Sequence, residues 1–284
     1  MNKLSYILST VFITTLISCG GGKDTSIEAE SVAVDSTLLK DSTKVDDLAE
    51  FKFQTTIANI PYPPADMYAA ITKTGAAYDA NLVNKKENLS KYATTAKRSL
   101  NYGVYSVDLI YLATTEKLGE AKGYLSVCRN LAKQLDMLES FDKIAKNHVE
   151  QSPENKDTVL KVVNEVYAAT DTYLRSNERL NVATQILVGS WIESQFVTLN
   201  ILKSASANAQ NAPLFNKVYE QKLHLGNLCN LLKEFEKEKD MQTTIADLNA
   251  LNAEYAKMKT EADAQTMIGN LLAKVTALRT KITS

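Results

Sequence analysis

Apolar residues recur at steps of three and four along most of this chain, and this period strongly restricts its fold. One run contains Val159, Val162, Val163 and Val166, and similar runs continue toward the C-terminus. Residues at this spacing share one face of an α-helix, and that face must be buried against another element. The alternation of period two that a half-buried strand needs is nearly absent beyond residues 51–57, a candidate extended strap. The pattern predicts an all-α fold.

Five prolines divide the chain, and each precedes an apolar-periodic run. Proline costs about 3 kcal/mol inside a helix but fits its first turn, so these residues indicate where helices begin. Ser152 before Pro153, and Asn211 before Ala212-Pro213, are the expected N-caps of two helices. The predicted helices span residues 64–75, 88–115, 120–135, 140–150, 154–175, 181–206, 213–238 and 241–282.

Short connections between these helices predict a multi-helix bundle of mostly antiparallel helices over residues 51–284. A domain of this length buries enough surface to be stable without crosslinks. Two points are open. Residues 241–282 form either one long helix or a hairpin that turns near Thr260, with Asp263 in a cap. Similar triplets that begin at Gly103 and Gly189 raise the alternative of two pseudo-equivalent halves.

The first residues of the chain resemble a lipoprotein signal. Lys3 precedes a mostly apolar run, as in a secretory signal peptide, and that run is shorter than the roughly 20 residues of a membrane span. The end of the run, Leu16-Ile17-Ser18-Cys19, resembles the lipobox of bacterial lipoproteins. This resemblance implies removal of residues 1–18, acylation of Cys19 and membrane attachment there. The alternatives are an ordinary signal with an incidental cysteine, or a buried N-terminal helix.

Residues 19–50 are predicted to be a flexible acidic tether. The three glycines 20–22 keep Cys19 accessible, and residues 23–50 contain three Lys, eight Asp or Glu and no aromatic residue. The two or three acyl chains usual in such proteins give a stable anchor. By resemblance to better-known lipoproteins, Gly20 in place of Asp after the acylated cysteine implies the outer membrane. Whether the protein faces the periplasm or the cell surface is open.

Composition argues against several classes of function. The net charge is −1, without a basic block, so we expect no nucleic-acid partner. The chain has two histidines, His148 and His224, and lacks a Cys-x-x-Cys, a phosphate-binding loop and a Gly-x-Ser-x-Gly. Glu220 and His224 share a helix face, but a di-metal site needs further paired Glu and His ligands. We expect no metal, no cofactor and no enzymatic activity.

Two cysteines follow Cys19, namely Cys128 and Cys229. The compartment beyond the inner membrane is oxidising and permits a disulfide between them. Each lies among apolar residues on a predicted helix, where a buried free thiol acts as a small hydrophobic side chain. A disulfide also requires Cα atoms within about 7 Å. The free thiols are the default interpretation, and the disulfide is the alternative.

One predicted helix carries a polar face within an apolar segment. Asn101, Tyr105, Asp108 and Tyr111 follow one another at steps of four, three and three, so they share that face. Two phenols and a carboxylate on such a face are suited to line a ligand cleft. The same residues are equally suited to tie helices together through buried hydrogen bonds from Tyr hydroxyls to the Asp carboxylate.

A second apolar helix raises the same alternatives around Trp191 and Glu193. Gly103 and Gly189 lie in the middle of the two helices, where glycine costs roughly 1 kcal/mol. Either close helix–helix approach or access for a ligand explains these glycines.

Five short segments carry a resemblance to known proteins. They are YPP at 62–64, KTGAAY at 73–78, LNYGVYSVDL at 100–109, NKDTVL at 155–160 and VGSWIE at 188–193. In this order they resemble a group of uncharacterised helical lipoproteins of Bacteroidetes over most of residues 60–200. The group has no known activity, so the resemblance implies a helical fold and the cell envelope, and no role for any residue.

These features together predict a lipid-anchored helical protein of the cell envelope. We expect a non-enzymatic binding or scaffolding module with an envelope protein as partner, which an exposed apolar patch larger than about 400 Å² would support. The alternative is a carrier of a small or apolar ligand. It requires an interhelical pocket of roughly 300 Å³ or more, bordered by Tyr105, Asp108, Tyr111 or Trp191.

Overall fold

The computed structural model describes residue 51 and residues 64–150, 155–205, 208 and 211–284. The chain divides into two units, Met1–Lys40 and Asp41–Ser284, and every described residue belongs to the second. The predicted signal peptide, Cys19 and most of the candidate strap lie outside the described residues. These predictions stay predictions.

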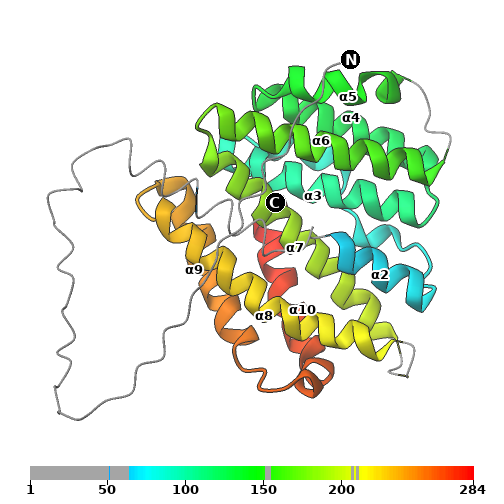
Figure 1. The fold of residues 1–284 in the computed structure, drawn as a ribbon, viewed down its shortest axis with the longest axis vertical. Coiled ribbons are helices and arrows are strands. Elements are labelled where there is room, and N and C mark those ends of the chain that lie inside the picture. Colours follow the sequence, from blue (N-terminus) through cyan, green and yellow to red (C-terminus); the bar gives the residue numbers. More distant parts are fainter. Residues whose placement is uncertain (1–50, 52–63, 151–154, 206–207, 209–210) are drawn as a thin grey trace, which may run out of the picture. The chain divides into compact units, whose positions relative to one another are not determined.

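The described residues form helices and no strand, which confirms the predicted all-α multi-helix bundle (Figure 1). The α-helices are α2 (Pro64–Thr74), α3 (Thr95–Thr114), α4 (Leu118–Gln134), α5 (Leu138–Glu150), α6 (Lys156–Ser176), α7 (Leu180–Ser204), α8 (Ala212–Leu232), α9 (Lys239–Tyr255) and α10 (Glu261–Thr283). Short 3-10 helices are η2 (Ala80–Leu82), η3 (Lys86–Lys91) and η4 (Lys233–Phe235).

The C-terminal region 241–282 is two helices and not one. Thr260 and Asp263 form a capping box, in which each side chain accepts a hydrogen bond from the other residue's backbone N–H. Such a box satisfies two N–H groups that a new helix leaves without partners. Helix α10 therefore begins after Thr260, and the hairpin alternative is correct.

Three other predicted boundaries were wrong. The helix predicted from residue 88 begins at Thr95, because the Thr94 side chain caps it by accepting from the backbone N–H of Lys97 at 3.1 Å. The helix predicted from residue 154 begins at Lys156 with Asn155, not Ser152, as its cap. The helix predicted to reach residue 238 ends earlier, where α8 passes into η4.

Three of the helix connections use one turn geometry. Glu116, Asp136 and Glu178 each adopt a positive φ, between 55° and 61°, directly after α3, α4 and α6. In each turn the following N–H reaches back to a carbonyl in the last helical turn, as from Lys117 to Leu112 at 2.8 Å. Such tight turns reverse the chain, as the short connections predicted.

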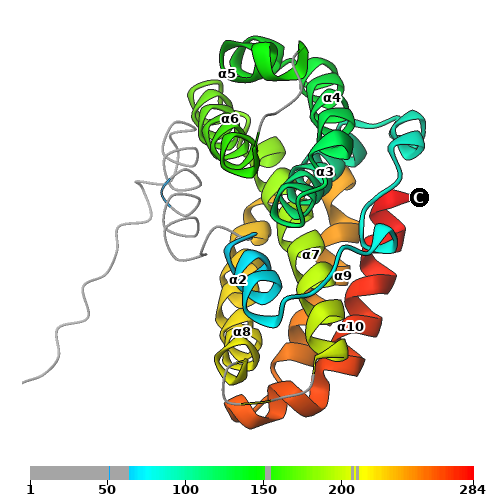
Figure 2. The ribbon, with the colours of Figure 1, turned by 90° about the vertical axis from the view of Figure 1, so that its right-hand side faces the viewer.

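Helices α3 and α7 cross with their backbones in contact at the centre of the core. A Cβ atom on Gly103 would overlap the backbone oxygen of Ile186, and one on Gly189 would overlap the backbone oxygen of Leu100. Close helix–helix approach therefore explains both glycines. Helix α7 is buried on all sides over most of its length and also contacts α2 and α10, which lie on opposite sides of it in Figure 2.

Candidate functional site

The polar face of α3 holds the connecting segment, residues 79–92, against the helix. The Tyr111 hydroxyl accepts a hydrogen bond from the backbone N–H of Asp79 at 2.8 Å. The Tyr105 hydroxyl donates to the backbone oxygen of Lys85 at 2.7 Å. Both phenols therefore satisfy backbone groups that the irregular segment leaves without partners.

Asn84 is the centre of this attachment. Its backbone N–H donates to the Asp108 carboxylate at 3.0 Å, and its backbone oxygen accepts from the Tyr124 hydroxyl at 2.9 Å. Its side-chain amide donates to the Tyr92 hydroxyl at 2.8 Å. The Tyr hydroxyls of α3 thus bind the backbone of the connecting segment. The expected hydrogen bonds from Tyr hydroxyls to the Asp108 carboxylate are not the ones that form.

Asn101 ties α3 to the end of α10. Its amide nitrogen donates to the backbone oxygen of Lys97 at 2.8 Å and to that of Ile282 at 2.7 Å. The second bond satisfies a carbonyl in the last turn of α10, where no intrahelical donor is available. The role of Asn101 in the structure is therefore to join two helices.

Asp108, Glu193 and Arg279 form a largely buried group that joins α3, α7 and α10. The guanidinium of Arg279 donates to the Glu193 carboxylate through Nε at 2.6 Å and Nη2 at 2.7 Å. It also stacks over the ring of Phe196 at 4.2 Å. This two-point pairing is the strongest geometry available to an arginine and a carboxylate.

The group contains two carboxyls for one guanidinium, and both carboxyl side chains are 0% exposed. Burial raises the pKa of Asp108 well above its ordinary value, and the negative charge of Glu193 raises it further, while Arg279 opposes this. Oδ1 of Asp108 has no donor within reach. A proton kept on Asp108 is available to donate to the Glu193 carboxylate, which also favours the acid form. The buried group is therefore neutral overall when Asp108 keeps its proton.

Sequence reasoning missed Arg279, although a signal was present. Arg279 lies in the apolar stripe of α10, four residues after Val275 and three before Ile282. A charged residue at that position faces the core and needs a partner of opposite charge. Burial opposes the charged form, but the charge and hydrogen bonds of Glu193 raise the pKa of Arg279.

Trp191 lies apart from this group. Its indole Nε1 donates to the Gln221 amide oxygen on α8 at 2.8 Å, and the Gln221 nitrogen donates to the Asp66 carboxylate on α2 at 2.8 Å. The Trp191 ring also packs 5.9 Å from the ring of Tyr255. Trp191 is therefore a core anchor between helices α2, α7, α8 and α9.

The six residues of the candidate polar cluster are at most 1% exposed. Five of them take part in the hydrogen bonds that attach the connecting segment and α10 to α3 and α7, and the sixth binds α8. The geometry is that of a hydrogen-bond network that fixes helices, as one of the two alternatives predicted.

Cys128 on α4 and Cys229 on α8 are both buried free thiols, so the possible disulfide is not formed. Burial raises the pKa of Cys128 to about 12 and that of Cys229 to about 11. Thiols with so little thiolate at neutral pH are poor nucleophiles, and both act as small apolar side chains.

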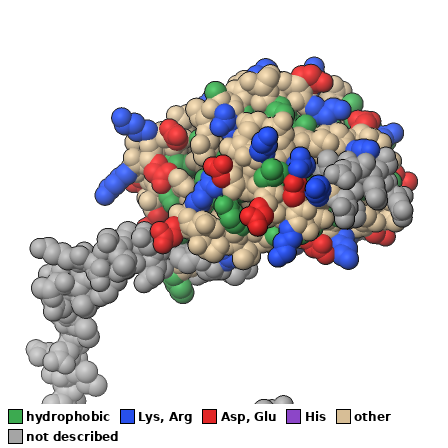
Figure 3. Space-filling model, turned by 90° about the horizontal axis from the view of Figure 1, so that it is seen from above, with side chains coloured by type: hydrophobic (Ala, Val, Ile, Leu, Met, Phe, Trp, Pro, Cys, Tyr) green, Lys and Arg blue, Asp and Glu red, His purple; other side chains and the backbone are tan. Residues whose placement is uncertain are grey.

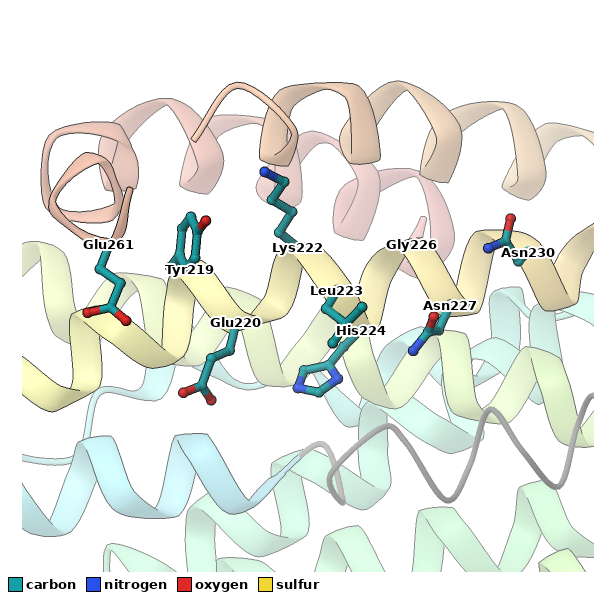
Figure 4. A pocket seen from close by; sticks show the side chains of 9 residues that line it. All are labelled: Tyr219, Glu220, Lys222, Leu223, His224, Gly226, Asn227, Asn230 and Glu261. Carbon is teal, nitrogen blue, oxygen red and sulfur yellow. The ribbon is translucent and has the colours of Figure 1, made fainter. Parts of the chain in front are cut away.

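An open groove runs along the outer face of α8 and has a volume of about 700 Å³ (Figure 4). Its central side chain, Leu223, is 65% exposed, whereas most large apolar side chains of the described chain are buried. We call this feature the α8 groove; it is lined by Tyr219, Glu220, Lys222, Leu223, His224, Gly226, Asn227, Asn230 and Glu261.

The two edges of the α8 groove differ. Tyr219 and Lys222 point toward α9 and α10, where the Lys222 ammonium lies over the Tyr219 ring and donates to the backbone oxygen of Met258 at 3.0 Å (Figure 4). Glu220 and His224 project from the opposite edge. Among the described residues, no three His, Cys, Asp or Glu side chains are grouped to hold a metal ion. The α8 groove is thus an apolar surface with polar edges.

Charges of both signs occur on one face of the protein. On the face shown in Figure 3, Lys and Arg side chains intermingle with Asp and Glu. That face has no extended field of one sign. Among the described helices, none is both long and apolar enough to span a bilayer.

Comparison of the chain with protein-family models, with curated proteins and with solved structures finds no match.

Proposed function

We propose that this chain is a lipid-anchored protein of the cell envelope, held in the outer membrane through Cys19, that acts as a non-enzymatic binding or scaffolding module. The partner is another protein, which docks in the α8 groove. The observation that carries the binding role is this groove, with its exposed Leu223. An apolar surface with polar edges is the usual form of a protein-docking site.

The contacts of the interior polar residues favour a binding role at the surface over the role of a ligand carrier. Tyr105, Asp108, Tyr111 and Trp191 would border the pocket of a ligand carrier, and none of them lines the α8 groove. Their polar atoms already bind the connecting segment and α8. The α8 groove is also open along its length, and such a surface fits a macromolecular partner better than an enclosed small ligand.

Metabolic labelling tests the anchor. Cells that express the full chain are fed a palmitate analogue with a click handle, and the Cys19→Ser variant serves as the control. We expect label on the wild-type chain, recovered with outer membranes, and none on the variant. Equal labelling of the Cys19→Ser chain contradicts the anchor.

Photo-crosslinking in intact cells tests the docking surface. A photoreactive phenylalanine analogue replaces Leu223 in one chain and Gly269, which is exposed on α10, in a control chain. We expect a discrete crosslinked species from position 223 and none of the same mass from position 269. Equal yields from the two positions would mean that the α8 groove is not a docking surface.

A further inference from the structure

The buried carboxyl of Asp108 lies beneath the connecting segment. Asn84 of this segment donates its backbone N–H to Asp108 Oδ2 at 3.0 Å, and both side chains are buried. The outer side of the segment faces solvent, with Lys85 and Lys86 exposed. In Figure 2 the segment follows the outside of the bundle on its way from α2 to α3. It is therefore the layer of chain that separates Asp108 from water on this side of the core.

The connecting segment has little regular structure of its own. It contains only the short 3-10 helices η2 and η3. Three phenols from α3 and α4 bind its backbone, namely Tyr105, Tyr111 and Tyr124. A segment of this kind opens locally at a lower free energy than the core helices. It is the part of the chain that can give Asp108 access to water without loss of the helical bundle.

The hydrogen-bond donors around Asp108 suit its acid form. Its Oδ2 accepts from Asn84, and its Oδ1 has no donor within reach. With its proton, Asp108 is available to donate to Glu193 and needs no second donor. Without the proton, the group holds two carboxylates for one guanidinium, and Oδ1 of Asp108 becomes a buried charged atom without a donor. Such an atom is costly unless water reaches it.

The neighbouring titratable groups leave this imbalance in place. Glu193 on α7 and Arg279 on α10 carry the charges that act most strongly on Asp108. The charge of Asp108 also acts on neutral groups of α3, α4 and the chain between α2 and α3, and burial raises the pKa of each: Tyr78, Tyr92, Tyr105, Tyr111, Tyr124 and Cys128. The hydroxyls of Tyr105 and Tyr124 already donate to the connecting segment. An ionised Asp108 gains a further donor only at the expense of these bonds or by admitting water.

We propose that a proton on Asp108 keeps the connecting segment closed against α3, and that loss of this proton favours local opening of residues 79–92. The step is an acid dissociation, in which Asp108 gives its proton to solvent while Glu193 and Arg279 keep their charges. The closed state binds the proton more tightly than the open, hydrated state. Closure is therefore favoured most at low pH, and opening becomes more frequent as pH rises toward the pKa of Asp108 in the closed state.

Hydrogen exchange of the full-length chain, followed by mass spectrometry of peptides over residues 79–92, tests this coupling. The amides of Asp79 and Asn84 report on it directly, because both bind side chains of α3. Exchange rates are corrected for the intrinsic rate at each pH. We expect protection to fall from pH 4 toward pH 8, by up to about ten-fold per pH unit. Asp108→Asn has no titrating proton, and its protection is expected to be independent of pH.

Low concentrations of urea separate local opening from unfolding of the whole domain. Urea lowers the free energy of an opening in proportion to the surface that the opening exposes. We expect residues 79–92 to be less protected than the centre of α7, residues 186–199, and to respond less to urea. Equal protection and equal urea dependence of the two regions would mean that the segment opens only when the domain unfolds, which overturns the proposal.

Two phenol substitutions test the attachment of the segment without a change at either carboxyl. Tyr124→Phe removes the donor to the Asn84 carbonyl and is expected to lower the protection of residues 79–92 about ten-fold at every pH. Tyr255→Phe removes a buried hydroxyl that binds Gln195, away from the segment, and is the matched control. We expect it to leave the protection of residues 79–92 unchanged, and equal effects of the two variants would contradict the attachment.

The pH dependence of the wild type decides the proposal even where Asp108→Asn does not fold. Protection of residues 79–92 that stays constant from pH 4 to pH 8 overturns it. An equal pH dependence in a folded Asp108→Asn chain also overturns it, because another group would then control the opening.

Discussion

Arg279 and Glu193 form a two-point ion pair inside the protein, at N–O distances of 2.6 and 2.7 Å, although 86 residues separate them in the sequence. Asp108 adds a second buried carboxyl to this pair. The three side chains come from α3, α7 and α10 and hold these helices in register. The polar cluster of the sequence is therefore part of the core.

Removal of the Glu193 charge is expected to destabilise the fold strongly. Glu193→Gln removes the two-point partner of the Arg279 guanidinium and leaves the Asp108 carboxyl as the remaining acid of the group, and breaking one side of a buried pair costs about 3–5 kcal/mol. Urea unfolding followed by circular dichroism measures this loss. Asp247→Asn, which removes a surface pair with Lys281, is the control and is expected to change stability by about 0–1 kcal/mol. Equal effects of the two variants would contradict the buried pair.

Asp108 is expected to make stability fall as pH rises. Its pKa is raised in the folded protein above the ordinary value of 3.8, so the folded state binds more protons than the unfolded state between the two values. This stabilising contribution is complete below pH 3.8 and is lost as pH rises through the folded pKa, by up to about 1.4 kcal/mol per pH unit.

Asp108→Asn isolates this contribution, because the amide keeps an acceptor for Asn84 and offers an N–H toward Glu193 without a titrating proton. We expect the stability of the wild type relative to Asp108→Asn to decline from pH 4 to neutral pH. Unfolding free energies from urea titrations at several pH values measure the difference. A difference that stays constant with pH would mean that Asp108 is ionised in the fold.

Two glycine substitutions, one at the crossing of α3 and α7 and one on the open face of α10, are expected to have opposite effects on stability. Gly189→Ala places a Cβ onto the Leu100 backbone, and such overpacking costs typically 1–3 kcal/mol and sometimes more. Gly269→Ala adds a methyl group in open space on α10 and is expected to stabilise by roughly 0.5–1 kcal/mol. Thermal melts of the two variants provide the comparison. A neutral Gly189→Ala would show that the helices do not meet at this glycine.

Sequence periodicity predicted the helices and the polar face of α3, because both depend on residues near one another in the chain. It could not identify the partners of that face. Asn84 belongs to an irregular segment without a period, and Arg279 reaches Glu193 only when α10 packs on α7. The cap of α6 was placed at Ser152 because that residue precedes a proline. The structure uses Asn155 instead, whose side chain accepts from the Thr158 N–H.

The exposed face of α8 could not be predicted for a related reason. Leu223 lies off the apolar stripe of Leu225 and Leu228, which are fully buried, because a step of two residues turns about 200° around a helix. Whether a leucine off the stripe remains exposed depends on how other helices cover that side of α8, and local spacing does not encode this packing.

The free cysteines give a chemical prediction. Burial raises the pKa of Cys128 to about 12 and that of Cys229 to about 11, so little thiolate exists at pH 8. We expect the folded protein to react with a maleimide far more slowly than the denatured protein, which exposes both thiols. Mass spectrometry of the labelled chain counts the modified residues. Rapid labelling of Cys128 in the folded state would contradict its place in the core.

The central claim is that Asp108 and its neighbours stabilise the fold whereas the α8 groove binds the partner. The most direct measurement uses full-length chains in membranes, each with a photoreactive residue at position 227. The crosslinked fraction is compared between two variants of this chain, Asp108→Asn and Leu223→Glu. The account predicts a crosslinked fraction near the wild-type level for Asp108→Asn and a strongly reduced fraction for Leu223→Glu. A loss with Asp108→Asn in a folded chain, together with normal crosslinking of Leu223→Glu, would contradict it.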